Sequence, residues 1–211
     1  MFSGITKGLY KINSVTHDSG ILNYTVQLSP ELVQHLKIGD SVSVNGVCQT
    51  VIKLDNINVS FQAIQETLDK TTLGELTIGC NVSIERSLRF GEDVGGHEVS
   101  GHVFGTATIF QRLEDGDNLS LIIQCNPQWM KYIIEKGFIA VDGSSLTVGD
   151  TIAEQGLFYL YLIPETLRVT NFPHKQVGDK VNIEFDCKTK TIVDTVEHFM
   201  LNHAGSLYKN K

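Results

Sequence analysis

Cys48 is the first candidate for a nucleophile in this 211-residue chain. It follows a tight Asn45-Gly46 turn and precedes two polar residues, Gln49 and Thr50, which is typical of a strand end. A buried cysteine more often packs as a small hydrophobic side chain than it reacts. An activated thiol at such a position would instead supply a nucleophile for covalent chemistry, so both interpretations stay open.

Two histidines offer acid–base chemistry in the segment Gly95-Gly-His-Glu-Val-Ser-Gly-His102. Imidazole exchanges protons near neutral pH, which suits a general base or a proton shuttle. In a strand, the five-residue spacing of His97 and His102 would place them on opposite faces, which disfavours a shared metal ion. The glycines are also typical of a linker. Asp186 and Lys136 are further candidates, although isolated charges of this kind more often lie on the surface.

The chain carries an internal duplication. Four segments recur in the same order at offsets of 97 or 99 residues: 4–8 with 101–105, 43–51 with 140–148, 66–68 with 165–167, and 79–85 with 178–184. Such a repeat predicts two copies of one fold, each with about half of the chain. Two copies of a fold bring two copies of any pocket, so differences between the copies indicate which pocket does chemistry.

The copies differ at the reactive positions. Cys48 corresponds to Ser145, Ile5 corresponds to His102, and Ser87 corresponds to Asp186. Other positions are shared, since Thr50 and Thr67 recur as Thr147 and Thr166. Duplicated hydroxyls suggest hydrogen bonds to one kind of ligand in both copies, although threonine is also simply common in strands.

Composition narrows the class of protein. A net charge of −7 and a pI near 5.4 argue against a nucleic-acid-binding protein. The sequence has no run of 18 apolar residues and no signal peptide, so we expect no membrane contact. The four cysteines lie far apart, without a CxxC pair, and reduced thiols in a cytoplasmic protein are the simplest interpretation.

Short β-branched segments dominate the sequence and predict an all-β fold of two tandem six-stranded Greek-key barrels. Asn45-Gly46 and Asp142-Gly143 predict hairpin turns with positive φ. The predicted strands are 23–28, 41–47, 49–54, 58–63 and 81–86, then 101–109, 119–125, 138–141, 145–148, 158–163 and 180–185. The predicted domains are 1–97, 98–188 and 189–211.

Helical patterns are few. Segment 29–37 has a Ser29 cap and an early proline, and 127–136 is its counterpart in the second half. The tail from 191 to 201 lies outside the repeat and carries an apolar stripe at helical spacing: Ile192, Val193, Val196, Phe199 and Met200. This stripe predicts either a contact between copies of the chain or packing on its own barrel.

Taken together, these segments resemble the riboflavin synthase family of the α-chain type along nearly the whole chain. The resemblance rests on Met1-Phe-Ser-Gly-Ile5, Val44-Asn-Gly-Val-Cys-Gln-Thr-Val51, the Gly95–Val103 segment, Lys136-Gly-Phe-Ile to Ser145-Leu-Thr-Val148, Ile163-Pro-Glu-Thr-Leu167 and Val181 to Asp186. It implies two six-stranded barrels, a C-terminal helix and a homotrimer assembled through that helix. Association with a lumazine synthase shell is a further implied partner.

The family reaction is a dismutation that uses no metal or organic cofactor. Two 6,7-dimethyl-8-ribityllumazine molecules exchange a four-carbon unit and give riboflavin and 5-amino-6-ribitylamino-uracil. The resemblance implies one substrate in each barrel and an active site between the N-terminal barrel of one subunit and the C-terminal barrel of the next.

The same resemblance implies two sets of substrate-binding residues. The first pocket is expected to use Cys48, Gln49, Thr50, Gln62, Ala63, Ile64, Gln65, Glu66, Thr67, Gly101, His102 and Val103. The second is expected to use Gly4, Ile5, Thr6, Ser145, Leu146, Thr147, Tyr161, Leu162, Ile163, Pro164, Glu165 and Thr166, with Lys136 reaching in from a neighbouring subunit. His97 is a further expected substrate-binding residue. In this assignment the N-terminal segment of each repeat serves the pocket of the other barrel. The sequence alone leaves open the alternative, in which each segment serves its own barrel.

Roles follow from the reaction that the resemblance implies. His102 is a candidate base for the proton of the lumazine C7 methyl group, while Cys48 and Ser41 would supply or activate a nucleophile. Asp186 and the threonines would hold ribityl hydroxyls or orient the ring. Gln49 replaces the usual leucine and Phe104 a frequent aspartate. The alternatives are a non-catalytic lumazine protein, which binds a lumazine or flavin as an antenna, and a structural protein without a ligand.

Overall fold

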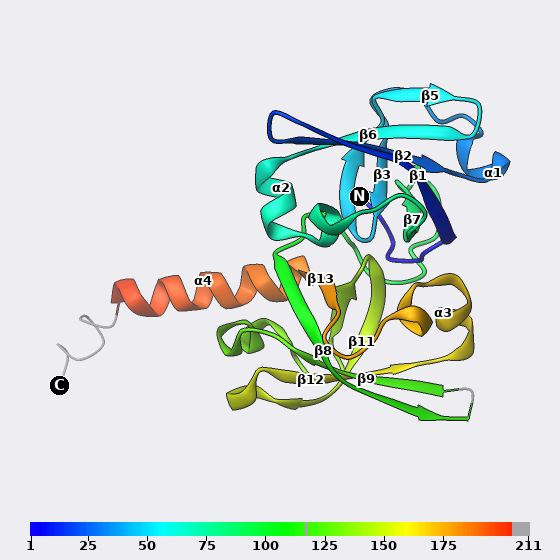
Figure 1. The fold of residues 1–211 in the computed structure, drawn as a ribbon. Coiled ribbons are helices and arrows are strands. Elements are labelled where there is room, and N and C mark those ends of the chain that lie inside the picture. The colour runs from blue at the N-terminus through cyan, green and yellow to red at the C-terminus, as the bar shows by residue number, and fades with distance from the viewer. Residues whose placement is uncertain (117, 204–211) are drawn as a thin grey trace, which may run out of the picture.

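The computed structural model describes residues 1–116 and 118–203, which form two β-domains and a projecting C-terminal helix (Figure 1). The first domain contains β1 Gly8–Asp18, β2 Ile21–Gln27, α1 Pro30–Val33, β3 Ser41–Val44, β4 Val47–Thr50, β5 Lys53–Asp55, β6 Asn58–Ile64, α2 Gln65–Lys70, η1 Thr72–Glu75 and β7 Asn81–Arg86. The second contains β8 Gly105–Asp115, β9 Asn118–Gln124, η2 Pro127–Tyr132, β10 Phe138–Val141, β11 Ser144–Ile152, η3 Ala153–Gln155, β12 Leu157–Leu162, α3 Pro164–Val169, η4 Phe172–His174 and β13 Lys180–Phe185. Helix α4 spans Cys187–His203.

The second domain is a closed six-stranded barrel in the order β10-β11-β12-β9-β8-β13. Strand β9 lies beside β12, so the three hairpin-connected strands β10 to β12 are joined to β9 by a Greek-key connection. Its interior is filled by alternate strand residues such as Ile109, Leu121 and Phe158, all fully buried. The sequence prediction of a six-stranded Greek-key barrel is confirmed for this half.

The first domain has seven strands in the order β4-β3-β7-β1-β2-β6-β5, and its sheet is not continuous around the barrel. The extra strand arises because the single long strand β11 of the second domain corresponds to two short pieces here, β4 and β5. Residues 51 and 52 interrupt them, although the N–H of Ile52 still donates to the carbonyl of Ser60 on β6 at 2.9 Å. The sequence prediction of one strand over 49–54 was therefore wrong.

Strand β1 is absent from the strands predicted from sequence, for a physical reason. A bulge between Ile12 and Ser14 shifts its alternation, and only Ile12 along this strand is fully buried. A strand with so little alternating hydrophobicity gives a weak sequence signal. Its repeat partner β8 carries a matching bulge between Ile109 and Gln111.

The two predicted helices 29–37 and 127–136 are shorter than expected. Ser29 does cap α1 by accepting a hydrogen bond from Leu32 N, but the helix ends after Val33. The chain then passes through His35 at φ +60° and buries Leu36 in the core. The second segment is a 3₁₀ helix that ends at Tyr132, capped by Asn126.

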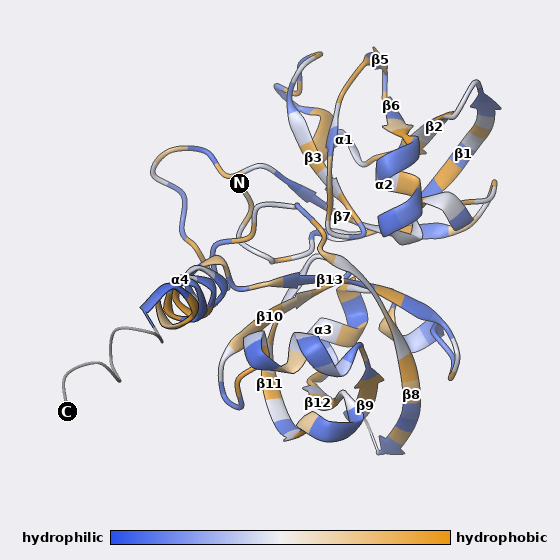
Figure 2. Ribbon diagram, turned by 90° about the vertical axis from the view of Figure 1, so that its left-hand side faces the viewer, coloured by the Kyte–Doolittle hydropathy of each residue, from blue (hydrophilic) through white to orange (hydrophobic). Residues whose placement is uncertain are grey.

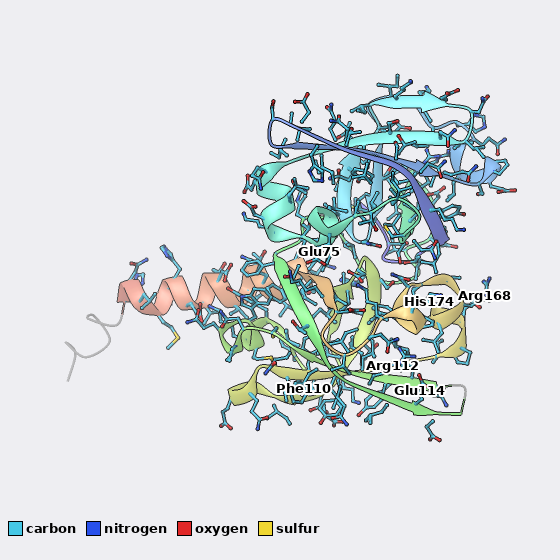
Figure 3. The ribbon with its side chains drawn as sticks, viewed as in Figure 1. Glu75, Phe110, Arg112, Glu114, Arg168 and His174 are labelled. Carbon is cyan, nitrogen blue, oxygen red and sulfur yellow. The ribbon has the colours of Figure 1, made fainter. Side chains whose placement is uncertain are left out.

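The two domains meet through pairs of equivalent residues. Phe2 and Val99, which are repeat partners, exchange backbone hydrogen bonds of 2.7 and 3.0 Å and are both buried. The hairpin tips Gly46 and Gly143, also repeat partners, pack against each other. A peripheral ion pair of 2.6 Å joins Glu75 of η1, labelled at the junction in Figure 3, to Lys180 of β13.

Helix α4 leaves the second domain and extends away from both barrels (Figures 1 and 2). Its first turns are held by Tyr132, whose hydroxyl donates to Asp194 at 2.5 Å, and by an ion pair between Lys131 and Glu197. Val193 alone of the predicted stripe packs on the barrel core, whereas Val196 and Phe199 are 51% and 56% exposed. No helix in the described ranges is long and apolar enough to cross a membrane.

Candidate functional site

A pocket of about 280 Å³ lies on the first barrel, between β4, α2 and the segment that links the domains. Its lining contains a thiol, an imidazole, a carboxylate, an ammonium group and hydroxyls: Val47, Cys48, Glu66, Thr67, Lys70, Thr71, Gly101, His102 and Val103. We call it the N pocket. The structure thus brings together two reactive side chains, Cys48 and His102, from segments 54 residues apart (102 − 48).

A second pocket of about 250 Å³ occupies the equivalent place on the second barrel. It is lined by Gly4, Ile5, Thr6, Ser144, Ser145, Leu146, Ile163, Glu165, Thr166, Val169 and Thr170, and we call it the C pocket. The duplicated threonines of α2 and α3 lie in corresponding places, since Thr67 lines the N pocket and Thr166 the C pocket. The C pocket has serine and isoleucine where the N pocket has Cys48 and His102.

Each pocket is completed by the N-terminal segment of the other repeat, so the structure has exchanged segments. The carbonyl of Gly101 accepts a 2.8 Å hydrogen bond from Cys48 N, and the carbonyl of Gly4 accepts one of the same length from Ser145 N. Both glycines have positive φ and approach so closely that an added Cβ would lie 2.6 Å from the partner Cβ. Thr6 and Ser144 hydroxyls meet at 3.0 Å in the C pocket.

His97 and Asp186 lie apart from His102, in a hollow of about 440 Å³ beside the C pocket. His97 is buried, stacks on Phe138 with a centroid distance of 5.2 Å, and its Nδ1 lies 2.6 Å from Ser145 Oγ. Ser145 is therefore the link between this hollow and the C pocket. Burial lowers the pKa of His97, and the charges of Asp186 and Glu184 oppose that change.

Asp186 stands at the start of α4. Partial burial acts to raise the pKa of this carboxyl, but hydrogen bonds from Thr189 and the charge of His97 outweigh it, so the pKa is lowered. Both the N–H and the hydroxyl of Thr189 donate to Asp186 Oδ2 at 2.8 Å. The carboxylate therefore stays ionised beside the imidazole.

Other predicted residues lie outside the two pockets. Strand alternation turns Gln49, Ala63 and Leu162 into the barrel interiors, where Gln49 accepts a 3.1 Å hydrogen bond from the Tyr24 hydroxyl. The remaining side chains are on the outside or at strand ends: Ser41, Thr50, Gln62, Ile64, Gln65, Lys136, Thr147, Tyr161 and Pro164. Tyr161, for example, is exposed and donates to Asp150 at 2.5 Å.

Sequence reasoning missed Lys70, which lines the N pocket and pairs with Glu66 at 2.8 Å. Its repeat partner at an offset of 99 residues is Val169 in the C pocket. The signal was present in the sequence, because Lys70 closely follows the repeated Glu-Thr-Leu tripeptide. Extending the comparison of the copies by two residues would have revealed this difference in charge.

No group of three His, Cys, Asp or Glu side chains within 1–116 and 118–203 is placed to hold a metal ion. All four cysteines carry free thiols. The linings of the two pockets offer a thiol, one imidazole, hydroxyls and charged side chains.

Comparison with known proteins agrees with the duplicated pockets. The lumazine binding domain family model matches the chain twice, at residues 3–87 and 100–186. Riboflavin synthase of Escherichia coli (strain K12) is 40% identical over 201 residues, covering 95% of this chain and 93% of that protein. Riboflavin synthase of Chlamydia pneumoniae is 40% identical over 200 residues, covering 95% and 97%.

Solved structures share the fold. A crystal structure of LumP complexed with riboflavin superposes with a TM-score of 0.81 at 23% identity, covering 88% of this chain and 99% of that one. A structure of LumP complexed with 6,7-dimethyl-8-(1′-D-ribityl)lumazine gives a TM-score of 0.77 at 23% identity, with 87% and 98% covered. Two domains with one ligand-binding fold account for the two pockets described above.

Proposed function

The chain belongs to the riboflavin synthase family, and we propose that it catalyses the family's dismutation with one 6,7-dimethyl-8-ribityllumazine bound in each of its two pockets. The enzyme is a transferase of a four-carbon unit. One lumazine gives up the unit and becomes 5-amino-6-ribitylamino-uracil, while the other takes it up and becomes riboflavin. Two identical substrates suit two pockets built from one repeated sequence.

The observation that carries this proposal is the difference between two otherwise equivalent pockets. The hydroxyls of Thr67 and Thr166 suit the ribityl chains that both substrates share. Only the N pocket adds Cys48 and His102. A dismutation needs such an asymmetry, because identical molecules must take different roles.

In this proposal, His102 accepts the proton of the lumazine C7 methyl group, which leaves a carbanion-like species on the ring. Cys48 supplies or activates the nucleophile for the other lumazine, which the C pocket of the neighbouring subunit would hold against the N pocket in the assembly proposed below. Ser41 and Asp186, which lie outside the two pockets, would act when a second subunit closes the site. Holding two rings in contact lowers the barrier by roughly 7–11 kcal/mol in favourable intramolecular cases.

The proposed assembly is a homotrimer. Isoleucine, valine, phenylalanine and methionine side chains of α4 project from the barrels, uncovered by the described chain: Ile192, Val196, Phe199 and Met200 are 51–63% exposed. An apolar helix face of this kind is stabilised when another copy buries it. The assembly would bring the N pocket of one subunit to the C pocket of the next, with Lys136 reaching in from the neighbour. A cytoplasmic location and association with lumazine synthase stay predictions.

Mixing the purified protein with 6,7-dimethyl-8-ribityllumazine alone tests the function. Absorbance and fluorescence should show one riboflavin formed for every two lumazines consumed. Tight binding without consumption would contradict the proposal and favour an antenna protein. If the lumazine is neither bound nor consumed, the proposal fails and the alternative of a structural protein is favoured.

A further inference from the structure

Two buried glutamates hold the exchanged segments in the same way. On β7, Glu85 Oε1 accepts hydrogen bonds of 2.7 Å from both the N–H and the hydroxyl of Ser3, and Oε2 accepts one of 3.1 Å from Gly4 N. On β13, Glu184 Oε1 accepts two bonds of 2.7 Å from Ser100, and Oε2 accepts one of 2.9 Å from Gly101 N. These glutamates are 3% and 7% exposed.

The segments they hold do not serve the barrel that carries the glutamate. Glu184 belongs to the second barrel, yet Gly101 and His102 line the N pocket on the first. Glu85 belongs to the first barrel, yet Gly4 and Ile5 line the C pocket on the second.

Each glutamate reaches its pocket through a short chain of hydrogen bonds. The hydroxyl of Ser100 donates to Glu184. The same hydroxyl oxygen accepts a 3.1 Å hydrogen bond from the backbone N–H of His102. Gly101, whose N–H donates to Glu184, in turn accepts a 2.8 Å hydrogen bond at its carbonyl from the backbone N–H of Cys48. The repeated arrangement runs from Glu85 through Ser3 and Gly4 to Ile5 and Ser145.

We propose that Glu184 and Glu85 are crossed positioning residues, so that the carboxylate on each barrel sets the shape of the ligand pocket on the other barrel. Glu184 fixes the backbone that carries His102 and covers Cys48. Glu85 fixes the backbone that packs on Ser145. The proposal rests on the proposed function for what binds in the pockets, but the crossed geometry itself does not depend on the ligand.

Substitution by glutamine is the appropriate change, because it keeps the size of the side chain. The amide has one acceptor oxygen where the carboxylate has two, so it cannot accept from both backbone N–H groups and the serine hydroxyl. Bonds to a charged acceptor are about twice as strong as neutral ones, so the held segment should open more often.

Thiol alkylation by iodoacetamide, located by peptide mass spectrometry, reports on each pocket. Cys48 is the natural reporter of the N pocket, because Gly101 packs directly over its Cβ. The double variant Cys48→Ser with Ser145→Cys moves the reporter to the equivalent position of the C pocket. Each reporter is measured in the full chain with Glu184→Gln, with Glu85→Gln, and with Glu114→Gln as a control. Glu114, labelled in Figure 3, is an exposed carboxylate on β8 that pairs with Arg112 and lines neither pocket.

Without ligand, Glu184→Gln should accelerate alkylation at position 48 by on the order of tenfold and leave position 145 unchanged. Glu85→Gln should do the reverse, and Glu114→Gln should change neither. Equal acceleration at both positions would show general destabilisation and overturn the proposal, as would an effect confined to the glutamate's own barrel or no effect at all.

Repeating the alkylation with riboflavin separates this proposal from the proposed function. Protection of Cys48 by riboflavin should be lost in Glu184→Gln and kept in Glu85→Gln. If the wild type neither turns over lumazine nor shows protection, the proposed function fails. The alkylation rates measured without ligand would still test the crossed positioning, because they do not depend on the ligand.

Discussion

Gly46 and Gly143 pack backbone against backbone where the two barrels meet: a Cβ added to Gly46 would lie 2.5 Å from the amide nitrogen of Gly143. Both are repeat partners at the tips of hairpins, and both have φ of +82°. Around them, Asn182 Nδ2 of the second barrel donates to the Asn45 carbonyl at 2.7 Å and to the Thr72 hydroxyl at 2.9 Å. The contact therefore requires glycine for space as well as for backbone conformation.

Gly46→Ala should lower the free energy of unfolding by more than the ~1 kcal/mol that positive φ alone costs. Thermal or denaturant unfolding measures it. Gly39→Ala is the matched control, because Gly39 has φ of +94° but nothing within 4 Å of its added Cβ. Equal losses in the two variants would show that the close approach of the hairpins contributes nothing.

Cys48→Ser and His102→Gln should each lower turnover by roughly ten- to a hundredfold, because general acid–base and nucleophilic groups typically contribute at least that much. Steady-state formation of riboflavin measures the loss. Cys80→Ser and His174→Gln are controls of the same residue types outside the described pockets and should retain the wild-type rate. Wild-type turnover in both Cys48→Ser and His102→Gln would remove these residues from the mechanism.

The repeat made much of this arrangement predictable from sequence. Asn45-Gly46 and Asp142-Gly143 were predicted as positive-φ turns, which the structure confirms, with φ of +47° and +82° at the first pair. The bulge at Ile12 concealed β1, because it breaks the alternation on which strand prediction depends. Whether Gly4 or Gly101 serves a given barrel was not decidable, since repeated segments fit either pocket equally well until both barrels are placed. The domain limits 1–97, 98–188 and 189–211 stay a prediction, and residues 204–211 of the last one lie outside the described chain.

Stability should fall below neutral pH because of His97. Burial lowers the pKa of this imidazole in the folded state, so the folded protein favours neutral His97. As pH falls below the unfolded pKa near 6.5, the unfolded chain binds the proton more readily, and stability is lost until the folded pKa is passed. Unfolding free energies at pH 7 and pH 5 should differ more for the wild type than for His97→Gln. A steeper pH dependence in His97→Gln would contradict the assignment.

Asp142 should behave in the opposite direction. Burial raises the pKa of this carboxyl, and the Lys175 ammonium at 3.4 Å opposes the rise. The ionised form is thus disfavoured, so the contribution to stability is largest at low pH and is lost as pH rises through the folded pKa. The first repeat has Asn45 in the same role, accepting from Ser83 N as Asp142 accepts from Asn182 N.

Asp142→Asn should therefore keep the turn. Its effect on the free energy of unfolding should be more stabilising at pH 7 than at pH 4. Asp142→Ala removes the acceptor of Asn182 N and should lower it by roughly 1–3 kcal/mol. Denaturant unfolding at both pH values measures the difference. A stabilising effect of asparagine that is larger at pH 4 than at pH 7 would refute this direction of the pH dependence.

The exposed face of α4 predicts the state of assembly. Val196→Lys with Met200→Lys should convert a trimer to monomers, because the charges would have to be buried between helices. Sedimentation velocity measures the mass, and turnover should fall with it, since each site needs two subunits in the proposed assembly. Thr195→Lys is the control, being exposed on the same helix outside the apolar stripe. A trimer that survives the double substitution would place the contact elsewhere, and full activity in a monomer would require both pockets of one chain to act together.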